Sequence, residues 1–156
     1  MVKVVGIGDM IISNNIEDRI KTFALASCVG IVAYSSTDKV GGLLHIALPK
    51  PVKMESVVSG NCYYATTGLP YFINKMCVMY GCRKSELTIR LYGGADSIRT
   101  NDVFNIGRKN IDIVYSILDG MDLKIASADI GRNISRTIEL DINTGKVNTW
   151  KQNIII

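Results

Sequence analysis

The sequence has very little histidine, no paired cysteines and no long apolar run. It contains one histidine and four cysteines, and no two cysteines have Cys-x-x-Cys spacing. A structural zinc site needs four closely spaced ligands, so this set excludes the usual zinc-binding patterns. No run approaches the ~18 apolar residues that span a bilayer. The apolar stretch at the start is soon broken by Asp9, Asn14 and Asn15, unlike a secretory signal. We therefore expect no metal, no membrane insertion and a cytoplasmic location.

The composition is that of an ordinary globular protein. The chain is 47% hydrophobic and 21% charged. It has no internal repeat, low-complexity stretch or linker, so we expect a single domain over residues 1–156. The net charge of +4 comes from scattered basic pairs with no aromatic side chains interleaved, which argues against nucleic-acid binding. These charges fit either a solvated surface or attraction to an acidic protein partner.

Hydrophobic patterning predicts a strand-rich chain with two helices. Period-two alternation and β-branched residues predict strands over residues 2–5, 28–34, 40–48, 87–91, 123–126, 137–142 and 147–150. Helical spacing predicts two apolar stripes, each followed by a glycine: Leu69, Ile73, Met76 and Tyr80, then Ile111, Val114, Tyr115 and Leu118. Gly6 and Gly8 lack the third glycine of a dinucleotide-binding turn, and we expect no cofactor. The sum is an α+β fold.

Cys28 and His45 face each other in the first predicted hairpin. A turn centred between Ser36 and Thr37 pairs these two residues directly across the antiparallel strands. Directly opposed residues have Cβ atoms ~5 Å apart and point to the same face. A bulge at residues 41–42, both glycine, would shift the register by one and send the two side chains to opposite faces.

A cysteine and a histidine at this separation suit nucleophilic chemistry. A free thiol has a pKa of about 8.5, and an imidazole that takes its proton creates and holds the thiolate. The imidazolium can then protonate a leaving amine. Small residues precede Cys28, so backbone N–H groups near Ser27 and Cys28 are candidates to hold an oxyanion. The same pattern also fits a buried structural cysteine beside a core histidine, and the pattern alone slightly favours that alternative.

The other three cysteines have no histidine within comparable reach. Cys77 falls on the apolar side of a predicted helix, Cys82 follows its terminal glycine, and Cys62 precedes two tyrosines near the start of that helix. We interpret all three as structural. A thiol redox sensor would need a resolving cysteine close in sequence to Cys28, and none is there.

Several motifs, taken together, resemble those of the CheD-type chemoreceptor glutamine deamidases. They occur in the family's order and span nearly the whole chain: Thr22-Phe23-Ala24-Leu25-Ala26-Ser27-Cys28-Val29, Gly42-Leu43-Leu44-His45-Ile46-Ala47-Leu48-Pro49, Tyr64-Ala65, Gly93-Gly94-Ala95, Asn105-Ile106-Gly107-x-x-Asn110 and Asn143-Thr144-Gly145-Lys146. No single motif is decisive, but the set in this order is specific.

The resemblance implies a fold, an activity and partners. It implies a layered α/β/β sandwich with two main helices, related to the cytotoxic necrotising toxins. It implies that Cys28 is the nucleophile, that His45 is the base, and that Thr22 orients His45 by a hydrogen bond. The implied reaction is that of a protein-glutamine glutaminase, a hydrolase that acts on glutamine side chains of the cytoplasmic region of chemoreceptors through a thioester. Glutamate methyl esters are a further implied substrate, and the CheC-type chemotaxis phosphatase is an implied partner.

The chain departs from the family pattern at two places. Ala26 stands where the family usually has glycine, and the segment 131–136 keeps one glycine of a glycine-rich, arginine-bearing loop. We expect these changes to affect substrate range and rate more than the chemistry. The altered segment also favours a rival function, that of a non-catalytic regulatory partner of the phosphatase.

Overall fold

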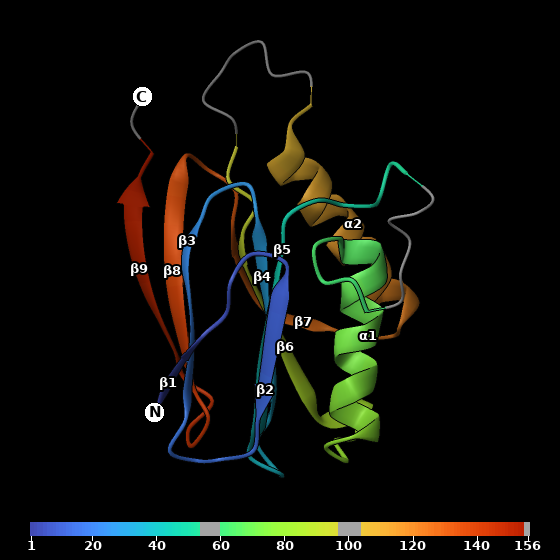
Figure 1. Cartoon of the computed structure of the whole chain (residues 1–156), viewed down its shortest axis with the longest axis vertical. Helices are drawn as coiled ribbons and strands as arrows, with labels where there is room; N and C mark the ends of the chain where they lie inside the picture. The colour runs from blue at the N-terminus through green and yellow to red at the C-terminus, as the bar shows by residue number, and fades with distance from the viewer. Residues whose placement is uncertain (54–59, 97–103, 155–156) are drawn as a thin grey trace.

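The computed structural model describes residues 1–53, 60–96 and 104–154. The elements form three layers that lie side by side in Figure 1: a four-stranded sheet, a five-stranded sheet and a pair of helices. The predicted α+β fold, a layered α/β/β sandwich with two main helices, is therefore confirmed. No helix in these ranges is long and apolar enough to cross a membrane.

The outer layer is a mixed sheet with one exposed face. Its strands, in spatial order, are β1 (Val2–Val4), β3 (Arg19–Leu25), β8 (Ile134–Asp141) and β9 (Val147–Asn153). β1 runs parallel to β3, and the other pairs are antiparallel. Buried side chains such as Ile20, Ile138 and Leu140 belong to the apolar cluster that fills the space between the two sheets. The predicted hairpin of β8 and β9 is confirmed.

The five-stranded sheet is the middle layer. Its strands, in spatial order, are β2 (Asp9–Ser13), β5 (Val40–Ile46), β4 (Val29–Ser35), β6 (Leu87–Gly93) and β7 (Ile125–Ile130). Every residue of β4 and β5 is buried, because one face of these strands packs on the helices and the other on the outer sheet. Burial on both faces explains why the sequences of β4 and β5 are nearly continuous apolar runs.

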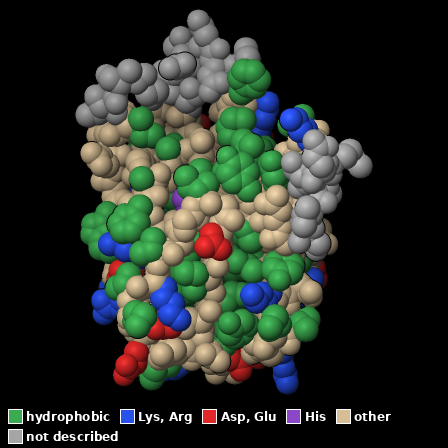
Figure 2. All heavy atoms as spheres, in the orientation of Figure 1, with side chains coloured by type: hydrophobic (Ala, Val, Ile, Leu, Met, Phe, Trp, Pro, Cys, Tyr) green, Lys and Arg blue, Asp and Glu red, His purple; other side chains and the backbone are tan. Residues whose placement is uncertain are grey.

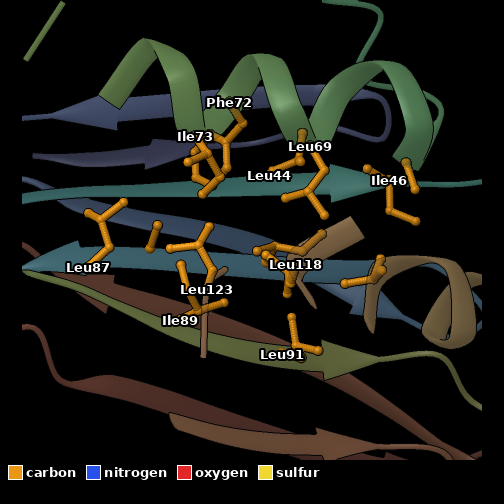
Figure 3. Close-up of a cluster of buried hydrophobic side chains, with 14 of the residues drawn as sticks. Leu44, Ile46, Leu69, Phe72, Ile73, Leu87, Ile89, Leu91, Leu118 and Leu123 are labelled. Carbon is orange, nitrogen blue, oxygen red and sulfur yellow. The ribbon is translucent and has the colours of Figure 1, made fainter. Parts of the chain in front are cut away.

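The helices cover the outer face of the middle sheet. They are α1 (Ala65–Val78) and α2 (Ile106–Gly120), and a short 3-10 turn, η2 (Lys84–Glu86), precedes β6. Figure 3 shows Leu69, Phe72 and Ile73 of α1 lying against Leu44 and Ile46 of β5. Most of the two predicted stripes is buried in this cluster. One predicted stripe residue differs, since Tyr115 is 41% exposed.

Two strands were not predicted, and one of them matters for the site. β2 has five residues and β3 has seven, and polar residues interrupt the apolar positions of both, so their period-two pattern is weak in the sequence. No bulge occurs at residues 41–42, and β4 and β5 pair without interruption. A side chain on Gly42 would come within 2.7 Å of the Phe72 ring, so the glycine allows α1 to pack closely on β5.

Candidate active site

His45 and Thr22 connect the two sheets through a buried hydrogen bond. His45 lies on β5 of the middle sheet and Thr22 on β3 of the outer sheet, and their Nδ1 and Oγ1 atoms are 2.7 Å apart. The imidazole is 2% exposed and Thr22 is fully buried. The hydrogen bond expected between these residues is present, and it lies in the space between the sheets.

The hydrogen bonds of Thr22 determine which nitrogen of His45 carries the proton. The Thr22 hydroxyl donates to the carbonyl oxygen of Val5 at 2.8 Å. A hydroxyl has only one hydrogen to donate, so its oxygen must accept the other bond from Nδ1–H of His45. Neutral His45 therefore has a bare Nε2, which is the nitrogen able to take a proton. That atom is buried and has no hydrogen-bond partner in the described residues.

Cys28 lies in the bend between β3 and β4, where the chain passes from one sheet to the other. The ladder pairs Gly30 with His45, so the predicted pairing of Cys28 with His45 is wrong by two residues. Because side chains alternate along a strand with a period of two, this shift keeps them on the same face. Cys28 is partly buried and packs against the cluster between the sheets. Both side chains therefore face the same space.

Burial favours the uncharged form of both Cys28 and His45. Burial raises the pKa of the Cys28 thiol, an effect that the backbone of Cys28 itself opposes. Burial also lowers the pKa of His45 to about 4, because removing water disfavours the charged form of each group. In the described residues, no hydrogen bond joins Cys28 Sγ to His45 Nε2. Both pKa shifts therefore favour the neutral thiol and the neutral imidazole over a resting thiolate–imidazolium pair.

The bend that carries Cys28 is held by the loop that follows β6. The N–H of Ala95 donates to the carbonyl oxygen of Ala26 at 2.7 Å, and the N–H of Gly94 donates to that of Cys28 at 2.8 Å. A Cβ on Gly93, whose φ is +101°, would collide with the carbonyl oxygen of Cys28. Only glycine combines this conformation with so close an approach. The glycine-glycine-alanine motif therefore holds the bend that carries Cys28.

The N–H groups of Ser27 and Cys28 lie in the bend between β3 and β4, beside the thiol. Among the described residues, no oxygen accepts a hydrogen bond from either group. Two neighbouring free N–H groups beside a thiol can stabilise the negative oxygen of a tetrahedral intermediate. Sequence reasoning identified this region through Ser27, but it did not identify the loop that holds it. A pair of glycines directly after a predicted strand was the available signal.

Several residues singled out from the sequence lie away from this site. Cys62 and Cys82 are buried and Cys77 is partly buried against the core beside the helices. The turn Asn143–Lys146 lies at the opposite end of β4 from Cys28, where the Tyr34 hydroxyl donates to the carbonyl oxygen of Ile142 at 2.8 Å. These groups stabilise the fold and do not meet Cys28.

The segment 131–136 has two different parts. Arg136 is fully buried and Arg132 is exposed. The N–H of Gly131 donates to the carbonyl oxygen of Gly93 at 2.9 Å, and the N–H of Arg132 donates to the Asp96 carboxylate at 3.1 Å. Arg136 therefore holds the segment 131–136 from its buried side through the carbonyl oxygens of Gly131 and Ile134. The end of the segment that carries Arg132 faces solvent.

The imidazole reaches the surface only at its edge. Figure 2 shows a small purple trace of the one histidine among hydrophobic side chains and backbone atoms on this face. Water therefore has little access to the ring of His45, which is 2% exposed. Within the described ranges, no group of three or more His, Cys, Asp or Glu side chains is placed to hold a metal ion.

The chain matches a known protein-family model. The family model for CheD, chemotactic sensory transduction, matches residues 47–151. The matched stretch starts two residues after His45, so it includes the loop after β6 and α2 but neither Cys28 nor His45.

Curated relatives match nearly the full length. A probable chemoreceptor glutamine deamidase CheD of Syntrophotalea carbinolica is 37% identical, over 93% of this chain and 91% of that protein. One of Syntrophus aciditrophicus is 35% identical over 92% and 90%, and one of Methanococcus maripaludis is 38% identical over 94% and 93%. Among solved structures, the Bacillus licheniformis hypothetical protein YfiH aligns with a TM-score of 0.49 and 8% identity, over 83% of this chain and 58% of that chain.

Proposed function

The chain belongs to the CheD family of chemotactic sensory transduction proteins, and on that premise we propose that it is a chemoreceptor glutamine deamidase in which Cys28 is the nucleophile and His45 the base. The observation that carries these roles is the bare Nε2 of His45. It faces the same inter-sheet space as Cys28, and the Thr22 hydrogen bond keeps the proton on the other nitrogen. The enzyme is a hydrolase of linear amides, a protein-glutamine glutaminase.

The first half of the reaction forms a thioester. Cys28 Sγ attacks the carbon of the glutamine carboxamide while its proton passes to His45 Nε2. The carbonyl oxygen becomes negative and accepts hydrogen bonds from the N–H groups of Ser27 and Cys28. The carbon–nitrogen bond then breaks, the nitrogen takes the proton from His45, and ammonia leaves.

The second half releases the acid. Neutral His45 accepts a proton from a water molecule as that water attacks the thioester carbon. The carbon–sulfur bond breaks, the sulfur recovers the proton from His45, and glutamate replaces glutamine in the substrate. A glutamate methyl ester enters the same sequence with methanol as the leaving group.

The low pKa of His45 suits its role as an acid. An imidazolium with a pKa of about 4 gives up its proton readily, which favours protonation of the departing nitrogen. The same low pKa makes neutral His45 a weak base when it takes the thiol proton in the first step. The oxyanion hydrogen bonds offset this weakness, because they act only once charge has moved to the substrate oxygen.

The relatives' names support the substrate class, and the finer assignments are our proposal. We assign the cytoplasmic signalling region of chemoreceptors as the substrate, the cytoplasm as the location, and the CheC-type phosphatase as a partner. A non-catalytic role is not favoured, because the relatives are named deamidases. A purely structural histidine also has no reason to leave a buried nitrogen unpaired, which costs about 1–3 kcal/mol.

The test is mass spectrometry of a receptor fragment incubated with the protein. Wild type should convert glutamine to glutamate at defined positions, and Cys28→Ala and His45→Ala should not. Cys62→Ala is the matched control, because Cys62 is a buried thiol that lies among the core residues beside the helices, and it should retain conversion. Conversion by Cys28→Ala, or its loss in the Cys62→Ala variant with the fold intact, would refute the assignment.

A further inference from the structure

Asn110 of α2 contacts both segments that carry the proposed catalytic pair. Its Nδ2 donates to the carbonyl oxygen of Ser27 at 2.9 Å and to the carbonyl oxygen of Ala47 at 3.0 Å. Ser27 directly precedes Cys28, and Ala47 follows His45 by two residues. The side chain is fully buried, so it cannot touch a substrate. One amide group thus connects the nucleophile bend to the end of β5.

The contact with Ser27 fixes the direction of a different group, the N–H of Cys28. The carbonyl of Ser27 and the N–H of Cys28 belong to one peptide unit, which is planar, and the described peptide bonds are all trans. In a trans peptide the carbonyl and the N–H point in opposite directions. A side chain that holds the carbonyl on the buried side therefore turns the N–H toward the open side.

A backbone hydrogen bond orients the preceding peptide unit, between Ala26 and Ser27, in the same way. The N–H of Ala95 holds the carbonyl of Ala26 at 2.7 Å, which sets the direction of the N–H of Ser27. Of the two candidate oxyanion donors, one is therefore aimed by a backbone contact and the other by Asn110. Since the fold supplies no backbone donor to the carbonyl of Ser27 among the described residues, a side chain is needed there.

We propose that Asn110 is a positioning residue that turns the N–H of Cys28 into the oxyanion site and fixes its place relative to His45; this rests on the proposed glutaminase function. The amide is well matched to the task, because it offers two hydrogens to two carbonyls. A carboxylate of the same shape would have none to offer and would repel both oxygens. A leucine of the same branched shape would leave both carbonyls unpaired.

The energetic cost of Asn110 supports a role other than stability. Its Oδ1 is buried without a hydrogen-bond partner in the described residues, and an unpaired buried acceptor costs about 1–3 kcal/mol. Asn110 can reach this position because Gly107, about one turn earlier in α2, packs directly on Gly94 and Ala95. The helix therefore rests on the same loop that holds Cys28.

The experiment compares Asn110→Leu and Asn110→Asp with Val114→Ala, a buried change one turn further along α2. We expect kcat for a glutamine-containing receptor fragment to fall about 10²-fold in both Asn110 variants, which is the usual effect of losing one oxyanion donor. KM should change less than about threefold. Val114→Ala should lower the unfolding temperature but leave kcat per folded molecule unchanged.

Two readouts separate positioning from general damage. Alkylation of Cys28 by iodoacetamide needs no oxyanion site, so its rate should change less than about threefold in the Asn110 variants. In the 1H–15N spectrum, the Cys28 amide signal should move more than signals from β9. A kcat per folded molecule within about twofold of wild type, loss of kcat and alkylation in parallel, or an unmoved Cys28 signal would overturn the proposal. An inactive wild type would instead refute the glutaminase assignment, and the Cys28 signal alone would then decide the role of Asn110.

Discussion

The Nδ1 atom of His45 and the hydroxyl oxygen of Thr22 are 2.7 Å apart and belong to different sheets. The geometry of the candidate site therefore depends on how the two sheets pack. Because the Thr22 hydrogen is given to the carbonyl oxygen of Val5, the orientation and the tautomer of the imidazole are fixed together. A change at Thr22 should consequently alter the proton chemistry of His45.

Thr22→Val tests whether the Thr22 hydroxyl controls the proton chemistry of His45. Valine has nearly the same shape but offers no acceptor to Nδ1–H, so we expect kcat to fall about 10- to 10²-fold, part of the usual value of acid–base assistance. The free energy of unfolding should fall by about 1–3 kcal/mol, since two buried polar groups lose their partner. Thr22→Ser keeps the hydroxyl and should recover most of the rate. Equal rates for the serine and valine variants would contradict the role of the hydroxyl.

The pH dependence of stability reports the buried imidazole. The pKa of His45 is lowered to about 4 in the folded protein, against about 6.5 in an unfolded chain. Between these values the unfolded chain binds the extra proton, so stability falls as the pH is lowered through this window. The contribution lost by pH 4.5 is about 2–3 kcal/mol.

His45→Gln is the matched variant, because His45 is the only histidine of the chain. Urea unfolding of both proteins at pH 7 and pH 4.5 gives two differences, in which the contributions of the carboxylates are shared. We expect wild type to lose more stability than the variant on acidification. If both lose the same amount, the imidazole is not buried as described.

Replacing Gly107 or Gly120 of α2 by alanine should change the stability of the protein in opposite directions. A Cβ on Gly107 would collide with the carbonyl oxygen of Ala95 and lie 2.9 Å from Gly94. Gly107→Ala should push α2 away from the loop that holds Cys28, with a loss of about 1–3 kcal/mol and lower kcat. A Cβ on Gly120 has no atom within 4 Å, so Gly120→Ala should raise stability by about 0.4–1 kcal/mol and leave kcat unchanged. Thermal unfolding and kcat measured on the pair check both signs.

The sequence predicted the layers of the fold better than the register of its strands. Strands β4 and β5 were predicted as a hairpin because their apolar runs flank a polar turn. The turn lies one residue further along than predicted, between Ser35 and Val40, and this shifts the pairing by two residues. The prediction that Cys28 and His45 share a face still holds, because a shift by an even number of residues leaves each side chain on the same side of the sheet.

Other parts of the site depend on contacts that the sequence does not display. Thr22 was identified through family resemblance, and its strand was missed because β3 is exposed on one face and interrupted near Ala24, where φ is +51°. The hydrogen bond from Thr22 to Val5 joins two residues 17 positions apart in the sequence and leaves no local pattern. Asn110 was matched as part of a motif, but its proposed role requires knowing that α2 begins beside the bend that carries Cys28.

Arg136 and Lys151 share the carboxylate of Asp129, and the two cations should differ in their contribution to stability. Arg136 is fully buried and contacts Asp129 at 3.0 Å, with further hydrogen bonds to the carbonyl oxygens of Gly131 and Ile134. Lys151 contacts the same carboxylate at 2.8 Å but its side chain is 48% exposed. Burial raises the pKa of Asp129, but the two cations lower it by more, so its pKa lies below the usual value. The carboxylate is therefore charged at neutral pH.

Arg136→Met should therefore cost about 2–3 kcal/mol, in the range for polar groups left without a partner, because three oxygens lose their donor while Asp129 keeps its ion pair with Lys151. Lys151→Met should cost at most about 1 kcal/mol, as is usual for an exposed pair. Urea unfolding at pH 7 measures both losses. Since Arg136 also holds the segment whose Gly131 bonds to Gly93, the first variant should lower kcat as well, while the second should not. Equal losses of stability from the two variants would mean that burial of Arg136 does not determine how the segment 131–136 is held.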